Sequence, residues 1–430
     1  MREATQALTV LAEIAPGARA LLEQRLAAIA ADLDGNAVFR PRELPDTHFM
    51  RFVIIDDARG EFPALLAWES NHDGDAADYL AQVARAAPAI TAVLACCAGY
   101  PAAGTADVER WVAWMLAHAH RAAAFYTGYR GIPRRAVVNA RGVRDAIRRE
   151  LDGCDRGAVG QLARCELPTW LRDRVAARDP TLDLSRDGPE GPELADEARW
   201  LLGKLVFGAV VLVLSPVILT GALVWYLVLR HHEERDFATA YARPLAVDPA
   251  VVGLEDRVAQ NQMTHVVDIK PGRFRLATLW LVLHAIDILV NIYWVRGELG
   301  GITDIHFARW VIVRDRRAVA PRRHRLVFFS NYDGSWESYL GEFIDRAASG
   351  LTAVWSNTVG FPATRHLLFA GASDEESFKQ WTREHQLPTQ VWWSGVPDAT
   401  VQNVRDDIAV RRRLARGLAD HEIDAWVRKL

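Results

Sequence analysis

The chain has 430 residues, of which 50% are hydrophobic and 24% are charged, and its formal net charge is −3. This composition excludes a disordered or collagen-like chain, and the near-neutral charge argues against a nucleic-acid-binding protein. The four cysteines form no CxxC pair, so we expect a reducing compartment and neither a disulfide framework nor a structural metal site. Glu3, Glu13, Glu23 and Arg25 lie within residues 1–34, where a secretory signal would have its apolar core, so we expect no such signal.

Two stretches of the chain are related to each other. LAWESNHDGDAADYL, which begins at Leu66, agrees with LVFFSNYDGSWESYL, which begins at Leu326, at seven of fifteen positions. Further blocks match in the same order, among them THFMRFVIIDD from Thr47 with IHFARWVIVRD from Ile305. This self-similarity indicates an internal repeat. We therefore divide the chain into repeat one, a linker, a membrane segment, a second linker and repeat two, at 1–155, 156–204, 205–229, 230–260 and 261–430.

Each repeat predicts the element order βαββαβ, which is the ferredoxin-like split βαβ pattern. In repeat one we expect a strand at 8–14, an amphipathic helix at 18–33 and a hairpin of two strands at 48–55 and 64–68. A second helix should follow Asp73-Gly74, and a closing strand should begin at Thr91. The hairpin and closing strand of repeat two are expected at 306–313, 326–329 and from Thr352. A Trp-bearing helix, an aromatic strand and a basic helix follow in both repeats.

The first strand of each hairpin is apolar on both faces. In 48–55 and in 306–313, both sets of alternating side chains are largely apolar, so both faces of each sheet must be covered. Helices cover one face, and we expect the sheet of the sister repeat to cover the other. The fold class predicted is α+β, with two tandem ferredoxin-like repeats packed sheet to sheet and one hydrophobic membrane helix.

The segment between the repeats contains 25 consecutive uncharged residues, Leu205–Leu229. A helix of this length measures about 37 Å, which exceeds a hydrocarbon layer of about 30 Å. Trp225 and Tyr226 near one end are typical of interfacial anchors. We therefore predict a membrane protein, with a buried soluble helix as the alternative.

A second apolar stretch, 276–294, lies between two strands that should belong to one sheet. A crossing there would place those strands on opposite sides of the membrane, so we expect this helix to pack against 205–229, to lie on the membrane surface or to be a core helix. A single crossing by 205–229 would also separate the repeats. Either each repeat pairs with a repeat of another molecule, as a homo-oligomer through the sheets, or Ser215-Pro216 breaks the segment into a re-entrant hairpin.

The basic loop 314–325 has no counterpart in repeat one. It is interpreted either as a solvated charge run or as a contact with anionic lipid on the cytoplasmic side. The second interpretation places repeat two in the cytoplasm.

Several polar residues are identical in the two repeats. His306, Arg309 and Asp333 of repeat two correspond to His48, Arg51 and Asp73 of repeat one. A buried Arg must be paired with a carboxylate. We expect Asp73 to pair with Arg51 and Asp333 with Arg309, because each aspartate lies on the neighbouring strand of the hairpin. His306 begins its strand, where we expect partial exposure, and only a β-bulge could place it in one pocket with Arg309. Two roles stay open: a structural ion pair, or a catalytic site in which Arg grips an anion and Asp or His moves a proton.

Aromatic residues suggest a second candidate site. Trp355, Trp392 and Trp393 either line a cofactor pocket or pack in the core. No P-loop, HExxH, GxSxG or correctly placed GxGxxG motif is present.

Tandem ferredoxin-like repeats in a sheet sandwich resemble the dimeric α+β barrel superfamily, which includes dye-decolourising peroxidases and chlorite dismutase-like haem proteins. The peroxidases carry a GxxDG motif, of which this chain keeps only Asp333-Gly334. The resemblance implies a distal role for Asp333 and Arg309, haem as cofactor, and His306 or His366 as its ligand. The motifs IHFARW and SNYDGSWESYL also resemble an uncharacterised bacterial membrane-associated family.

Taken together, the sequence predicts a membrane-anchored protein of two ferredoxin-like repeats that binds a small-molecule ligand or a partner through the sheet or hairpin surface. The alternative is an enzyme, a haem-dependent peroxidase-like oxidoreductase.

Overall fold

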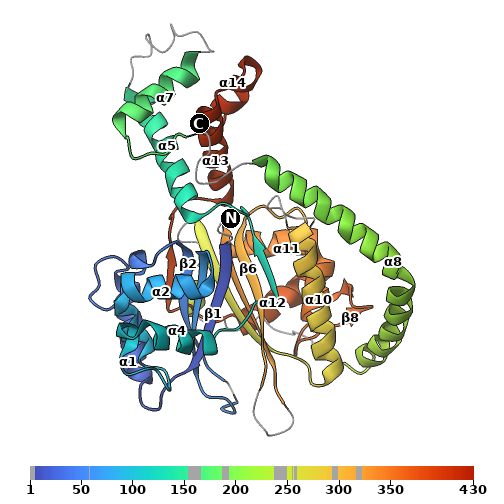
Figure 1. Cartoon of the computed structure of the whole chain (residues 1–430). Helices are drawn as coiled ribbons and strands as arrows, with labels where there is room; N and C mark the ends of the chain where they lie inside the picture. Colours follow the sequence, from blue (N-terminus) through green and yellow to red (C-terminus); the bar gives the residue numbers. More distant parts are fainter. Residues whose placement is uncertain are drawn as a thin grey trace.

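Two four-stranded antiparallel sheets form the centre of the molecule (Figure 1). The computed structural model describes residues 5–57, 59–153, 166–185, 193–236, 249–253, 255, 259–292, 299–315 and 322–430. Sheet 1 has the order β1-β3-β2-β10, from Thr5–Glu13, Leu65–Asp73, Thr47–Ile55 and Val391–Ser394. Sheet 2 has the order β4-β6-β7-β5, from Ala124–Thr127, Ile305–Val313, Arg325–Asp333 and Gln260–Asp268.

Each sheet takes its fourth strand from the other half of the chain. β10 pairs antiparallel with β2, so that Trp392 lies opposite Arg51, and β4 pairs with β6, so that Phe125 lies opposite Arg309. The expected closing strands are wrong: Thr91 begins helix α3 (Thr91–Leu94), and Thr352 lies inside helix α11 (Trp336–Trp355). The aromatic strands predicted further along the chain fill the edges instead, and the two halves are thereby interlocked.

Helices cover the outer face of each sheet. Sheet 1 carries α1 (Arg19–Ala31), α2 (Ala76–Ala86) and α4 (Val108–Ala117), whose apolar side chains form one core with it. Sheet 2 carries α10 (Arg273–Ile292), α11 and α12 (Glu375–His385) in the same way.

The inner faces of the two sheets pack on each other. Leu11, Val53 and Ala67 of sheet 1 share a buried cluster with Val327 and Phe329 of sheet 2. Strand β2 is buried along its whole length, as a strand with two covered faces must be. Both halves therefore belong to one body, within a single chain.

A group of helices extends from one end of the sheets (Figure 1). The long helices α5 (Arg134–Gly153) and α13 (Val401–Arg416) pack on one another and, with α7 (Leu167–Arg178) and α14 (Asp420–Val427), enclose a separate apolar cluster. The segment predicted as a linker at 156–204 therefore contains helix α7 and the start of α8. Short 3-10 turns occur at Pro41–Glu43, Pro88–Ile90, Gly104–Ala106 and Gly371–Ser373.

Helix α8 (Glu193–Glu233) forms an arch along the flank of the molecule, beside α10 (Figure 1). It continues through Pro216 as one helix, so Ser215-Pro216 does not break the segment into the two helices of a hairpin. Two described helices are long and apolar enough to cross a membrane: 201–233, with mean hydropathy 2.4 and none of its apolar window buried, and 273–292, with mean hydropathy 1.6. A short helix, α9 (Pro249–Val252), and the small hairpin of β8 (Thr364–Arg365) with β9 (Phe369–Ala370) complete the description.

Candidate functional site

A β-bulge near the start of β2 and of β6 sets the direction of the two predicted histidines. The strand register shifts between Thr47 and Phe49, and between Ile305 and Phe307. His306 therefore turns toward sheet 1, where its ring lies 5.1 Å from that of Phe49, and Arg309 faces the same sheet through a hydrogen bond to Asn71. The bulge thus places His306 and Arg309 on one face, in the space between the sheets.

Each histidine forms a buried pair with the aspartate of its own repeat. His48 Nε2 lies 3.0 Å from Asp73 Oδ1, and His306 Nε2 lies 2.8 Å from Asp333 Oδ1. His306 is fully buried, so the expected partial exposure is wrong. Burial alone would raise the pKa of the Asp73 carboxyl, but the charge and hydrogen bond of His48, with the Arg134 amide, hold that pKa below its ordinary value.

The second carboxylate oxygen of each pair caps a helix. Asp73 Oδ2 accepts a hydrogen bond from the amide of Arg134 at the start of α5, at 2.6 Å, and Asp333 Oδ2 accepts one from Val401 at the start of α13, at 2.7 Å. A carboxylate at a helix N-terminus is stabilised by unpaired amides and by the helix dipole. The two His–Asp pairs therefore fasten the projecting helices to the sheets.

Arg51 and Arg309, which occupy equivalent positions in the two halves, share one carboxylate. Arg51 Nε donates to Glu69 Oε2 at 2.7 Å, and Arg309 Nη2 lies 2.5 Å from Glu69 Oε1. The expected pairs Arg51–Asp73 and Arg309–Asp333 are therefore wrong, because both aspartates are taken up by His48 and His306. All three side chains of this Arg–Glu–Arg cluster are buried.

Each arginine also reaches across to the opposite sheet. Arg51 donates to the carbonyls of Met263 and Ser330, and Arg309 donates to the carbonyls of Leu8 and Ser70. Burial lowers the pKa of Arg309 to about 10, against the opposing effect of Glu69. With every predicted residue of this set hydrogen-bonded to protein groups, the geometry accounts for them as ties between sheets and helices.

The three residues expected to bind a cofactor lie apart. His366 is in the β8–β9 turn, where its Nδ1 atom lies 2.9 Å from the Tyr226 hydroxyl of α8. Trp355 belongs to the core on the outer face of sheet 2, whereas Trp393 belongs to the core on the outer face of sheet 1. The structure does not bring them together. Trp392 stacks on Phe49 and donates to Asn331 Oδ1 at 2.9 Å, again between the sheets.

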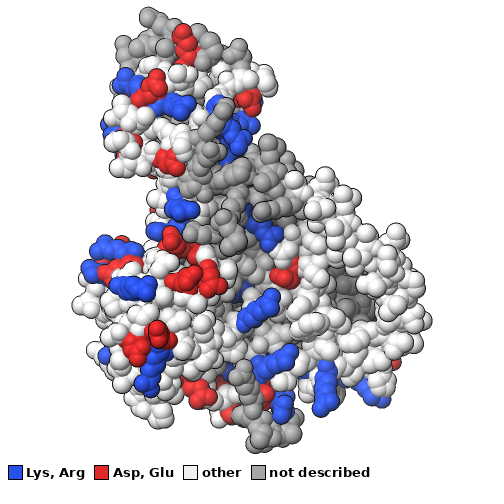
Figure 2. Space-filling model, in the orientation of Figure 1, with Lys and Arg blue, Asp and Glu red and all other residues white. Residues whose placement is uncertain are grey.

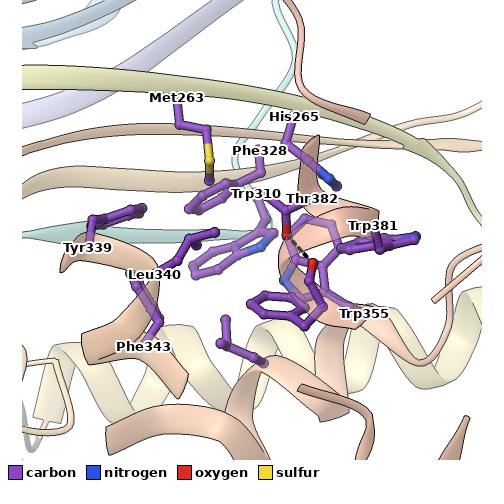
Figure 3. A pocket seen from close by; sticks show the side chains of 12 residues that line it. Met263, His265, Trp310, Phe328, Tyr339, Leu340, Phe343, Trp355, Trp381 and Thr382 are labelled. Carbon is purple, nitrogen blue, oxygen red and sulfur yellow. Dashed lines mark hydrogen bonds between the residues drawn. The ribbon is translucent and has the colours of Figure 1, made fainter. Parts of the chain in front are cut away.

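A small pocket lies on the outer face of sheet 2, under α11 and α12 (Figure 3). Its walls are almost wholly apolar and aromatic: Met263, His265, Trp310, Phe328, Tyr339, Leu340, Phe343, Leu351, Trp355, Phe378, Trp381 and Thr382. Side chains alternate along β5, so Met263 and His265 face this pocket while Gln262 and Thr264 face sheet 1 and bind Arg51.

His265 is the one ionisable group in the pocket wall apart from the Tyr339 phenol. Its ring lies 4.9 Å from Trp355 and 4.7 Å from Trp381, and neither ring nitrogen has a hydrogen-bond partner among the described residues. Burial lowers the pKa of His265 well below its ordinary value, so the ring is neutral at pH 7, with one donor and one acceptor nitrogen. Trp310 Nε1 in the same wall is likewise unpartnered there.

His265 and Glu69 were not predicted from the sequence, although a comparison of the two repeats could have identified them. Val10 of repeat one occupies the position of His265, and Phe329 of repeat two occupies the position of Glu69. In each case a polar residue stands at a core position where the sister repeat keeps an apolar one.

Comparison with known proteins yields no match to a family model, to a curated protein or to a solved structure.

Proposed function

We propose that this chain is a membrane-anchored binding protein that takes up a small, largely apolar molecule in the pocket on sheet 2. Its two halves are, in this proposal, ferredoxin-like repeats of the dimeric α+β barrel type that have exchanged their edge strands. The single observation that carries the proposal is a buried imidazole with two unpartnered nitrogens in an otherwise apolar pocket.

The pocket is favoured over the sheet surfaces because those surfaces are covered. The inner faces pack on each other and the outer faces carry helices. The space between these walls is small, so in this proposal only a compact molecule of one ring enters, and it displaces the surrounding side chains as it does so. An unsatisfied buried donor or acceptor costs about 1–3 kcal/mol, and a ligand hydroxyl would recover part of that cost at His265.

The chemical class supported is therefore a single aromatic ring with one hydroxyl group. Aromatic walls such as Trp310 and Trp355 contact the faces and edges of such a ring. Phenol and toluene are suitable probes, because they have nearly the same shape and differ in the hydroxyl group.

The test compares the two probes in thermal unfolding of the detergent-solubilised protein. Phenol should raise the melting temperature more than toluene does, because its affinity for the unchanged protein should be about 5- to 150-fold higher than that of toluene. In His265→Val the two probes should have the same affinity. Valine is a matched choice, since Val10 stands at this position in repeat one. His72→Phe is the control, because His72 is also buried with unpartnered nitrogens but lies on sheet 1. An equal phenol preference in His265→Val would overturn the proposal.

Membrane anchoring rests on helix α8, whose apolar window is wholly exposed in the described structure. A chain without 205–229 should lose carbonate-resistant association with membranes. Continued tight association of that deletion variant would refute the anchoring role of α8.

The residues first considered for haem do not fit that group. His366 is engaged by Tyr226, His306 is bonded to Asp333, and Trp355 and Trp393 lie in different cores. Arg309 and Asp333 are saturated by protein groups, which leaves neither one directed at a ligand. An absorption spectrum after expression with added haem tests this point, and we expect no Soret band; a stoichiometric Soret band would restore the peroxidase alternative.

A further inference from the structure

Helix α8 poses a question of topology, because its two ends belong to the same body. At its C-terminal end, Glu233 accepts hydrogen bonds from the amides of His366 and Leu367, and Asp236 just beyond pairs with Lys270 and Arg275. Before α8, Ser185 is held by Arg411 of α13 at 2.6 Å. Since the sheets pack on each other within one chain, these two anchor points lie on one side of any membrane.

A chain that starts and ends on one side must cross a membrane an even number of times. The stretch from Arg186 to Lys204 contains eight charged residues, both ends included, so it cannot pass through hydrocarbon at an acceptable cost. Only the 25 residues of Leu205–Leu229 are uncharged, and two crossings would need about 40 residues. A single crossing is excluded because both ends of the segment lie on the same side. A double crossing is excluded because the uncharged stretch is too short for it.

The shape of α8 agrees with this count. Figure 1 shows α8 as an arch whose ends approach the body and whose middle bows outward. Its segment Leu205–Leu229 has no charged residue on any side, and Leu212 and Val213 within it are 75% and 76% exposed, which is unlike a surface helix in contact with water.

The backbone at the middle of the arch is also adapted to lipid. Pro216 has no amide to donate to the carbonyl of Leu212, and a vacant carbonyl in hydrocarbon is costly. The Ser215 hydroxyl donates to that carbonyl instead, at 2.8 Å, and Thr220 donates its hydroxyl to the carbonyl of Pro216 at 2.9 Å. The carbonyl of Leu212 therefore has a donor in spite of Pro216, and the hydroxyls of Ser215 and Thr220 both donate within the helix.

A second element displays apolar side chains beside the C-terminal end of α8. The β8–β9 turn holds His366, Leu367 and Ala370 at positive φ, a strained conformation for residues other than glycine. That turn presents Leu368 and Phe369 to the outside, with Phe369 59% exposed. Figure 2 shows the flank formed by α8 as almost free of charge, with Lys and Arg gathered along its lower border.

From these observations we propose that α8 is a monotopic anchor: it enters one leaflet, arches through it and leaves through the same leaflet, and the β8–β9 hairpin inserts beside it. The occupant of this surface is the lipid leaflet itself. The inference rests on the membrane anchoring proposed above and adds its geometry.

The test labels cysteines at both ends of α8 in membranes of intact and lysed cells with an impermeant maleimide. Gly203→Cys and Glu234→Cys are suitable sites, because Gly203 has open space for a side chain and Glu234 is 67% exposed. Cys154 and Cys165, which lie outside the described residues, are replaced by Ser, while Cys96 and Cys97 are buried. Leu116→Cys on α4 reports the side on which the sheets lie.

All three sites should react from the same side of the membrane. Reaction of Gly203→Cys and Glu234→Cys from opposite sides would overturn the monotopic geometry while leaving anchoring intact. Recovery of the protein in the soluble fraction would instead refute the proposed anchoring, and with it this inference.

A separate fluorescence experiment tests whether the β8–β9 turn inserts into the membrane. A polarity-sensitive fluorophore on Phe369→Cys should shift to the blue in phosphatidylcholine–phosphatidylglycerol vesicles and be quenched by spin-labelled lipid. The same fluorophore on Leu116→Cys should show neither effect. An unshifted, unquenched signal at Phe369→Cys would remove the turn from the membrane surface.

Discussion

Replacement of Glu69 by glutamine removes the one carboxylate that balances two buried guanidinium groups. Arg51 and Arg309 contact opposite oxygens of Glu69 at 2.7 and 2.5 Å, and all three side chains are no more than 1% exposed. At an effective dielectric constant of about 20, each contact with charge centres about 4 Å apart contributes about 4 kcal/mol. Repulsion between the two arginines offsets part of that sum.

We therefore expect Glu69→Gln to lower the free energy of unfolding by about 3–5 kcal/mol, the range for removal of one partner from a buried ion pair. Urea unfolding in detergent, followed by tryptophan fluorescence, measures the change. Glu23→Gln is the control, since Glu23 is 51% exposed and its contact with Arg19 should contribute less than about 1 kcal/mol.

Arg309→Leu provides a second comparison. That change leaves Glu69 paired with Arg51 alone, which is balanced in charge, so it should cost less than Glu69→Gln although it removes the hydrogen bonds to Leu8 and Ser70. The reasoning would be refuted if Glu69→Gln cost no more than Glu23→Gln, or if Arg309→Leu were the more damaging change. Under a site role for Arg309, stability would instead hold and ligand binding would be lost.

Two further predictions concern pH and the interlocked halves. Burial lowers the pKa of His72 to about 3, so the unfolded chain binds a proton below pH 6.5 that the folded chain does not, and stability should fall as the pH drops through that window. His72→Phe should remove about 1.4 kcal/mol per pH unit of this dependence in urea midpoints at pH 5 and 6, and an unchanged slope would contradict the assignment. Residues 1–153 expressed alone lack β10, so they should not form a folded monomer. Co-expression with residues 259–430 should restore a soluble complex. A stable monomer of residues 1–153 in light scattering would contradict the strand exchange.

Much of the local structure was readable from the sequence. Short runs with apolar residues on both faces located β2 and β6 to within a residue, because such a run suits a strand that is covered on both faces. The uncharged run Leu205–Leu229 predicted helix α8 for the same kind of local reason. The identical residues of the two repeats also led to His48, Asp73 and their counterparts, although not to the bonds between them.

The partners of those residues were decided only by the tertiary structure. A four-residue aromatic strand such as β10 can pair with either sheet edge, and nothing in its local pattern states which. The Arg–Glu–Arg cluster joins residues 18 and 240 positions apart, and the pocket at His265 depends on how α11 and α12 lie over sheet 2. By itself the sequence determined the long strands and the apolar helix, because short-range periodicity sets them. Strand exchange, charge pairing and the two ends of α8 on one body come from long-range packing, which no local pattern contains.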